Sequence, residues 1–160
     1  MKPTDLEVIT PLLGRDLLLD YTFGGGFFED ADLASGRRPG TAATARDLQV
    51  GGGLDNFTQA IANRLKTRKG ELAPLGHPDY GSRHHELVGE PNVDRTRDLI
   101  KLYVLQALRD EPRIAKVLDV AVVAEHDPPR DSVRITLSVR LVRQATTVNL
   151  VIPFSLEARL

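Results

Sequence analysis

Val133-Arg134-Ile135-Thr136-Leu137-Ser138-Val139-Arg140-Leu141 alternates apolar and polar side chains without a break. Because successive side chains of a β-strand point to opposite faces, this pattern predicts a half-buried strand. The alternation recurs from Val148 to Leu156, and the preceding segment from Val117 to Ala124 is mostly apolar. We therefore expect an antiparallel meander of three or more strands. Pro153 marks the last strand as an edge, because proline has no N–H to donate to a neighbour.

A first helix is predicted on the N-terminal side of this sheet, from about Asp55 to Thr67. Phe57, Ile61 and Leu65 repeat every four residues and form one apolar stripe. A glycine shortly after the end of this pattern is well placed to stop the helix.

A second helix is predicted from Asn92 or Asp94 to Arg109 or Asp110. Its apolar residues cover most of its circumference, which is typical of a helix buried on several sides. Pro112 ends it, because the residue before proline avoids the helical region. The fold class is therefore α+β, with the two main helices packed on one face of the meander.

Residues 1–53 carry little hydrophobic periodicity and no internal repeat that we recognise. Asp16 to Tyr21 could form a short buried strand and Thr41 to Leu48 a short helix. The glycine triplets Gly24–Gly26 and Gly51–Gly53 are typical of hinges. We expect an extended N-terminal arm over residues 1–53, ordered by a partner, followed by one domain over residues 54–160.

Composition excludes several classes of function. Of 160 residues, 21 are basic and 22 acidic, so a net charge of −1 provides no field toward nucleic acid or an anionic membrane. Cysteine is absent, which removes disulfides and thiolate chemistry. No apolar run approaches the ~20 residues that a membrane helix needs. The acidic N-terminal residues do not resemble a signal peptide, and we expect cytoplasmic synthesis.

Catalytic and metal sites are weakly supported. His77, His84 and His85 lie near Asp79, but adjacent histidines would point apart on a helix, so we expect no metal. Glu71 and Asp79 flank one loop and could serve a glycosidase, although such pairs arise by chance and sugar-binding aromatics are scarce. The glycine triplets lack the lysine of a phosphate-binding loop. We expect no cofactor and no enzymatic activity.

Two short motifs remain after these exclusions. In the loop Pro78–Ser82, proline presets a turn, Asp79 can cap backbone N–H groups, Tyr80 can anchor the loop, and Gly81 relieves a tight conformation. That combination predicts a loop that holds its shape. In Glu111-Pro112-Arg113, opposite charges flank a fixed corner. This corner is either a local salt bridge at a helix end or a charged contact with a neighbouring subunit.

The order of these motifs resembles one known family. An apolar helix ends in Arg64-Leu65-x-Thr67-x-x-Gly70-Glu71, and the Pro78–Ser82 loop, Glu86-Leu87, Ala107-Leu108 and Glu111–Ile114 follow. This order is similar to the gene-product-25-like baseplate wedge, or sheath-initiator, family of contractile injection machines. Such machines include contractile phage tails, tailocins, type VI secretion systems and extracellular injection particles. The resemblance covers roughly Asp55 to Leu156.

The resemblance implies a structural role, although family members have been called lysozyme-like. It implies that Glu111, Pro112 and Arg113 contact the helical core bundle of the baseplate wedge. It also implies that the C-terminal strands template the first sheath ring by β-augmentation. The expected partners are wedge and sheath proteins, with the tail hub or spike as a further candidate and several copies per particle. A peptidoglycan hydrolase of a tail baseplate is the alternative.

The candidate partner-binding residues are thus Asp79, Tyr80, Gly81, Glu111, Pro112 and Arg113. The sequence departs from the family at His84, where an aliphatic residue is usual, and in its longer N-terminal segment.

Overall fold

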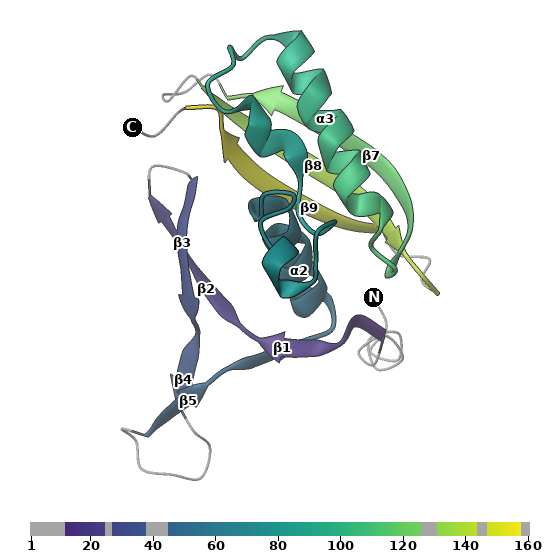
Figure 1. Cartoon of the computed structure of the whole chain (residues 1–160). Coiled ribbons are helices and arrows are strands. Elements are labelled where there is room, and N and C mark those ends of the chain that lie inside the picture. Colours follow the sequence, from purple (N-terminus) through teal and green to yellow (C-terminus); the bar gives the residue numbers. More distant parts are fainter. Residues whose placement is uncertain (1–11, 25–26, 38–44, 126–130, 144–146, 158–160) are drawn as a thin grey trace. The chain divides into compact units, whose positions relative to one another are not determined.

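A computed structural model of the chain describes residues 12–24, 27–37, 45–125, 131–143 and 147–157. Two units can be distinguished, Met1–Ala60 and Ile61–Leu160. The division lies inside helix α2 (Leu54–Lys66), which begins in the first unit and ends in the second (Figure 1).

The second unit contains the predicted meander. Strands β7 (Ile114–Ala124), β8 (Ser132–Leu141) and β9 (Thr147–Ser155) form an antiparallel sheet in the order β7-β8-β9. On β8, each apolar residue of the alternating pattern is at most 1% exposed: Val133, Ile135, Leu137, Val139 and Leu141. This strand therefore supplies the middle of the core, as its alternation predicts. Pro153 lies on edge strand β9, opposite Arg134, which confirms that prediction.

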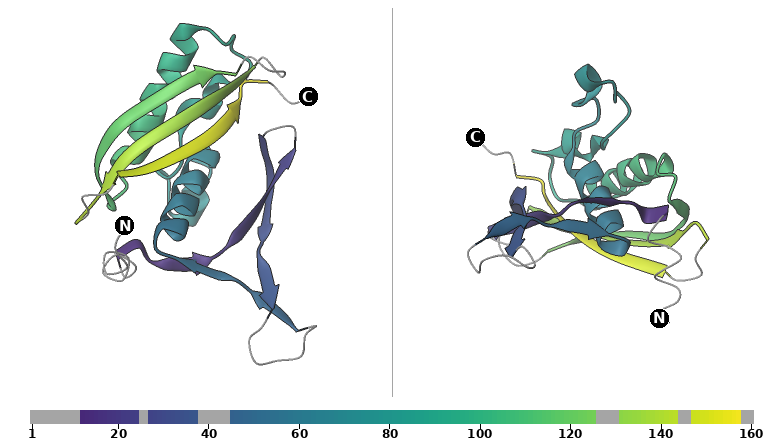
Figure 2. Two further views of the ribbon diagram at one scale, coloured as in Figure 1. Left: turned by 180° about the vertical axis from the view of Figure 1, so that it is seen from behind. Right: turned by 90° about the horizontal axis from the view of Figure 1, so that it is seen from below.

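Helix α3 (Asp94–Arg109) covers one face of this sheet, and Figure 2 shows the sheet from its open side with α3 behind it. Two 3₁₀ helices, η1 (Ala73–Leu75) and η2 (Arg83–Leu87), lie in the segment that joins α2 to α3. The prediction that the second helix is buried on several sides is wrong. Ile100 and Val104 are fully buried, but Leu102 is 46% exposed. A single stripe of α3 faces the sheet.

Six short strands form the first unit, where we expected an arm with little regular structure. They are β1 (Arg15–Leu17), β2 (Leu19–Gly24), β3 (Phe27–Leu33), β4 (Ser35–Arg37), β5 (Arg46–Leu48) and β6 (Val50–Gly52). They pair antiparallel as three two-stranded ribbons: β1 with β6, β2 with β3, and β4 with β5. Four of these strands, β1, β4, β5 and β6, have three residues each and are too short for hydrophobic periodicity to reveal them.

Three local predictions for this unit need correction. Asp16 to Tyr21 is not one buried strand, because Leu18 separates β1 from β2 and none of the six residues is buried. The described part of the helix predicted over Thr41 to Leu48 is strand β5; residues 41–44 lie outside the described residues. Of the predicted hinge at Gly24–Gly26, only Gly24 is described, at the end of β2.

Candidate docking surface around Arg64

The loop after α2 is closed by a short parallel bridge between Arg68 and Ser82. The Ser82 N–H donates to the carbonyl of Thr67 at 2.9 Å, and the Lys69 N–H donates to the carbonyl of Ser82 at 3.1 Å. Gly81 has a φ of +99°, and a Cβ there would lie 2.7 Å from the Thr67 carbonyl oxygen. Glycine is therefore required on both conformational and steric grounds, as predicted for a loop that holds its shape.

Arg64, on the last turns of α2, joins this loop to the Glu111 corner. Its guanidinium carbon lies 4.6 Å from the centre of the Tyr80 ring. Arg64 Nη2 is also 3.4 Å from Glu111 Oε2, while Arg113 Nε lies 2.5 Å from Glu111 Oε1. A cation over an aromatic ring and a carboxylate shared by two guanidinium groups are both attractive. We call these four side chains the Arg64 cluster: Arg64, Tyr80, Glu111 and Arg113.

Burial decides what each group of the Arg64 cluster can contact. The Glu111 side chain is only 3% exposed, and the Arg64 side chain 12%. Arg113 retains 23% exposure. A buried carboxylate needs ion pairs and hydrogen bonds to offset its lost hydration, and Glu111 obtains both within the chain. Of the two interpretations of the corner, the local salt bridge is thus present in the structure.

The electrostatics of the Arg64 cluster follow from the same contacts. Burial tends to raise the pKa of Glu111. The hydrogen bond and charge of Arg113, with the charge of Arg64, outweigh burial, so this pKa lies below its ordinary value. Burial raises the pKa of the Tyr80 phenol; Arg64 opposes this rise and Glu111 adds to it. Glu111 is therefore held as a carboxylate at neutral pH.

Two candidate partner-binding residues, Pro112 and Asp79, are next in sequence to members of the Arg64 cluster. Pro112 is exposed. The Asp79 side chain is 84% exposed and forms a loose pair with Lys69 at 3.7 Å. An exposed pair of this kind adds about 0–1 kcal/mol to stability. The structure thus brings Tyr80, Glu111 and Arg113 together, and leaves Asp79 and Pro112 as exposed neighbours in the sequence.

Sequence reasoning missed the central residue. Arg64 lies with Lys66, Arg68 and Lys69 in a basic cluster whose composition is typical of a solvated helix end or a protein contact, yet the Arg64 side chain is only 12% exposed. The signal was present, because Arg64 follows Ile61 by three residues and so lies on the buried face of the helix. A basic residue on an apolar stripe loses hydration and is stabilised by a nearby carboxylate, which here is Glu111.

The adjacent histidines also differ from expectation. Instead of pointing apart, the rings of His84 and His85 stack with their centres 4.2 Å apart, and the edge of Phe154 packs against both. His84 Nδ1 lies 2.7 Å from the Ser82 hydroxyl, and His85 Nε2 lies 2.7 Å from the Leu65 carbonyl oxygen. Burial lowers the pKa of His84 to about 3. The imidazole of His84 is accordingly packed in the interior and neutral at pH 7.

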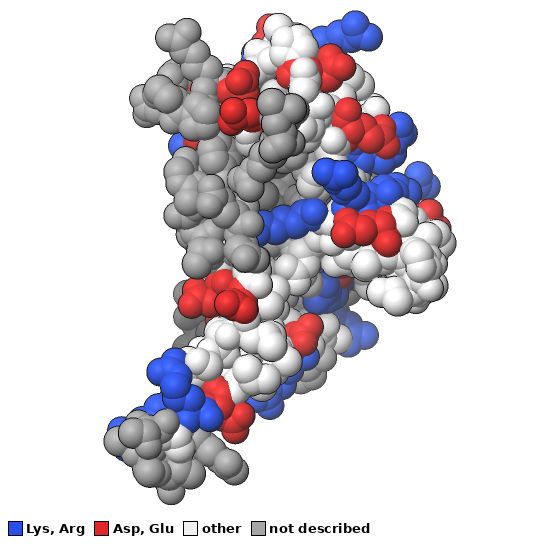
Figure 3. Space-filling view, turned by 60° about the vertical axis from the view of Figure 1, so that its left-hand side comes forward, with Lys and Arg blue, Asp and Glu red and all other residues white. Residues whose placement is uncertain are grey.

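The residues that the structure describes offer little support for other kinds of site. They contain no group of three or more metal-ligating side chains, and no helix long and apolar enough to cross a membrane. Glu71 and Asp79, the carboxylates considered for hydrolysis, are both exposed, whereas a general acid is usually sheltered from water. On the face in Figure 3, acidic and basic side chains are interspersed without a broad field of one sign.

These features define an α+β domain, a helix-covered three-stranded meander whose central charged groups are engaged with one another. Comparison with known proteins identifies its family. The sequence model of the family described as baseplate wedge protein gp25 matches residues 53–147, and the chain belongs to this family. The resemblance read from the motif order is thereby confirmed. The chain is a structural component of a phage-tail baseplate and assembles with other baseplate proteins into a tail particle.

One solved structure supports the same fold. A crystal structure from Geobacter sulfurreducens, of a protein provisionally described as a tail lysozyme, matches with 30% sequence identity and a TM-score of 0.55. The match covers 63% of this chain and 88% of that chain. No curated protein matches the sequence.

Proposed function

We propose that the chain is a non-enzymatic sheath initiator that docks on the helical core bundle of the baseplate wedge through its Pro112–Arg113 corner. One observation carries this proposal. Glu111 binds Arg64 and Arg113 at once, so the corner is fixed to the end of α2 and to the Tyr80 loop. A corner held in this way presents its groups with little loss of conformational entropy on binding.

The proposal divides the roles within the motif. Glu111 is a positioning residue, because its carboxylate is buried and engaged by the chain itself. Pro112 and the exposed part of Arg113 make the contact, and Asp79 extends it from the neighbouring loop. An arginine at such a rim can form a second, paired contact with a carboxylate on a partner helix. The proposal thus assigns the contact to two of the three corner residues that the sequence indicated.

The open edge of β9 is the proposed template for the sheath. The Leu156 N–H donates inward to the Asp131 carbonyl at 2.8 Å, so by alternation the backbone of residues 147, 149, 151 and 153 faces the open edge. Pro153 offers no N–H there. A sheath strand would therefore pair along Thr147 to Val151 and stop before Pro153.

Val151→Pro tests this edge, since it removes an outward N–H without removing a bond of the β8–β9 ladder. Val151→Ala retains that N–H and serves as the control. We expect baseplates with Val151→Pro to contain the chain but to lack ordered sheath, whereas Val151→Ala particles assemble normally. Full-length sheaths on Val151→Pro baseplates, seen by negative-stain electron microscopy, would show that β9 is not the template.

Arg113→Ala tests the docking corner. Arg134, on the outer side of β8 and paired with Glu125, is a matched control because its side chain is 58% exposed. Both variants should fold, but only Arg113→Ala should be absent from purified baseplates. The proposal is wrong if the two variants are incorporated equally.

We further propose that residues 1–53 contact neighbouring subunits, with several copies of the chain around the hub. The rival function is a peptidoglycan hydrolase that uses Glu71 and Asp79, favoured by the description of the Geobacter protein. Turnover of purified peptidoglycan separates the two. We expect none; activity that Glu71→Gln abolishes would establish the hydrolase.

A further inference from the structure

The first unit contains a short repeat that the sequence analysis overlooked. The dipeptide Asp-Leu occurs at Asp16-Leu17, Asp32-Leu33 and Asp47-Leu48. Each copy ends a described strand and is followed by a single residue before the next strand begins. These three junction residues are Leu18, Ala34 and Gln49. Residues 1–53 therefore contain a short structural repeat that hydrophobic periodicity does not reveal.

The junction residues bind one another in a ring. The Leu18 N–H donates to the Gln49 carbonyl at 2.8 Å, and the Gln49 N–H donates to the Ala34 carbonyl at 2.9 Å. The Ala34 N–H completes the ring by donating to the Leu18 carbonyl at 2.8 Å. The three ribbons diverge from this ring (Figure 1). The unit thus has approximate threefold symmetry, with three equivalent outer edges between neighbouring ribbons.

The first outer edge is filled by the chain's own helix. Because the backbone of Leu18 points into the ring, the flanking Leu17 carbonyl and Leu19 N–H point outward. The Gln59 side chain on α2 bonds both groups: its Nε2 donates to the Leu17 carbonyl and its Oε1 accepts from the Leu19 N–H, each at 2.8 Å. Gln59 is only 7% exposed. A helical carboxamide is therefore a fitting ligand for this edge.

The second edge, beside Ala34, carries a charged side chain instead. Arg46 reaches back along its ribbon, and its Nη2 donates to the Ser35 carbonyl at 2.6 Å. Its Nε donates to the Ser35 hydroxyl at 3.1 Å. Neither bond reaches the groups equivalent to those that Gln59 binds, but the charged guanidinium lies beside them, so this edge suits an apolar partner less well than the third.

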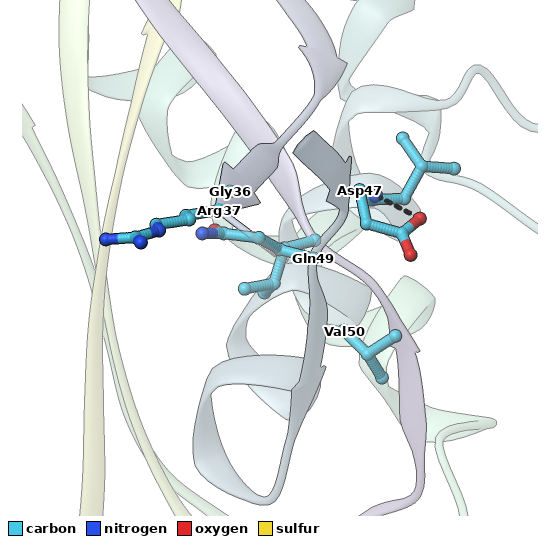
Figure 4. A pocket seen from close by; sticks show the side chains of 7 residues that line it. Gly36, Arg37, Asp47, Gln49 and Val50 are labelled. Atoms are coloured by element: carbon cyan, nitrogen blue, oxygen red, sulfur yellow. Dashed lines mark hydrogen bonds between the residues drawn. The ribbon is translucent and has the colours of Figure 1, made fainter. Parts of the chain in front are cut away.

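The third edge, beside Gln49, is open. By the same alternation the Leu48 carbonyl and the Val50 N–H point outward, and among the described residues no side chain bonds to either group. Leu48 and Val50 are 47% and 52% exposed. A hollow of about 390 Å³ lies here, and Figure 4 shows it. It is lined by Leu18, Gly36, Arg37, Asp47, Leu48, Gln49 and Val50.

Two features shape this hollow. An added Cβ at Gly36 would lie 2.2 Å from the Gln49 amide nitrogen, so glycine makes room for that side chain. Asp47 accepts the Leu48 N–H at 2.9 Å, as Asp16 accepts the Leu17 N–H at 2.8 Å in the first repeat. The third edge therefore repeats the aspartate-to-backbone hydrogen bond of the first edge. It differs in that the basic side chain of Arg37 lines it.

We propose that the third edge binds an amphipathic helix of another baseplate protein. The helix inserts a glutamine or asparagine carboxamide between the Leu48 carbonyl and the Val50 N–H, as Gln59 does at the first edge. Apolar residues one turn away cover the Leu48 and Val50 side chains, and an acidic residue faces Arg37. This contact is separate from the Arg113 corner and does not depend on it.

Photo-crosslinking in assembled particles tests this proposal. A benzophenone amino acid is placed at Leu48, and, as the matched control, at the repeat-equivalent Leu33. Particles are purified, irradiated and analysed by mass spectrometry. We expect a crosslink from position 48 to a segment of another baseplate protein with helical apolar spacing and a glutamine or asparagine, and a yield at position 33 at least tenfold lower.

A second variant tests the bonding scheme itself. Val50→Pro removes the outward N–H, whereas Val50→Ala retains it. We expect the crosslinked helix, made as a peptide, to bind the Val50→Pro chain about tenfold more weakly than the Val50→Ala chain, because one partly buried hydrogen bond is lost.

The crosslinking result overturns the inference if particles that contain the chain give no crosslink at position 48, or equal yields at positions 33 and 48. A crosslink to a second copy of this chain, or to an extended strand, also overturns it. In the peptide experiment, equal affinities of the two Val50 variants would overturn it. Absence of the chain from particles would instead count against the proposed baseplate function.

Discussion

Replacing Glu111 with alanine should destabilise the chain more than an ordinary surface substitution at a helix end. The Glu111 carboxylate is 3% exposed and binds Arg113 Nε at 2.5 Å and Arg64 Nη2 at 3.4 Å. Removing one partner from a buried ion pair costs about 3–5 kcal/mol. Because Arg64 and Arg113 retain 12% and 23% exposure, water relieves part of that cost. We expect a loss of about 2–3 kcal/mol in the free energy of unfolding.

Urea and thermal unfolding of the purified chain measure this loss. For a chain of this length the expected loss corresponds to a fall in Tm of about 5–10 °C. Glu111→Gln should lose less, because its amide oxygen still accepts from Arg113. Arg113→Ala should lose about 1–2 kcal/mol, because the buried Glu111 carboxylate loses its shorter contact but keeps its pair with Arg64. A loss below about 0.5 kcal/mol for Glu111→Ala would refute the view that Glu111 holds the corner together.

Two further predictions concern the same unit. Between pH 6.5 and 5 the unfolded chain binds protons that the folded chain cannot accept at His84, whose pKa burial lowers to about 3. Stability should therefore fall as the pH is lowered, by about 1.6 kcal/mol over this interval, and His84→Leu should flatten the pH dependence of the urea midpoint. An unchanged slope would contradict a buried neutral imidazole. Gly81→Ala should cost roughly 2–3 kcal/mol because an added Cβ meets the Thr67 carbonyl. Gly76→Ala, with a similar φ of +87° and open space around it, should cost only about 1 kcal/mol; equal losses would exclude the steric explanation.

The predictability of the second unit follows from the length of its elements. The alternation from Val133 to Leu141 spans a whole strand, so the pattern repeats often enough to fix both strand and buried face. Helix α2 was recognised for a similar reason, from its stripe of Phe57, Ile61 and Leu65. Gly81 could be placed because its neighbours Pro78 and Asp79 have specific turn preferences.

The ribbons of the first unit could not be predicted in this way. Strands β1, β4, β5 and β6 contain three residues each, and a single residue such as Leu18 separates one ribbon from the next. Their stability comes from long-range backbone bonds, including the ring through Ala34 and Gln49, which local patterns do not encode. The Asp-Leu repeat was the available signal.

The candidate site shows a second limit of sequence reasoning. The Glu111-Pro112-Arg113 motif was found, but the partner that buries Glu111 lies 47 residues earlier on α2. Spacing along the chain does not show which of several basic residues near Arg64 reaches the carboxylate. We therefore propose a positioning role for Glu111, whereas the contact expected of Arg113 stays a prediction.

A cryo-electron microscopy structure of the assembled baseplate tests the central claim most directly, because it locates the Pro112–Arg113 corner in the particle. The account predicts that this corner lies against the helical core bundle of the wedge, with the Arg113 guanidinium within hydrogen-bond distance of a wedge carboxylate or carbonyl. A corner that faces solvent, with the chain held in the baseplate by other surfaces alone, would contradict it.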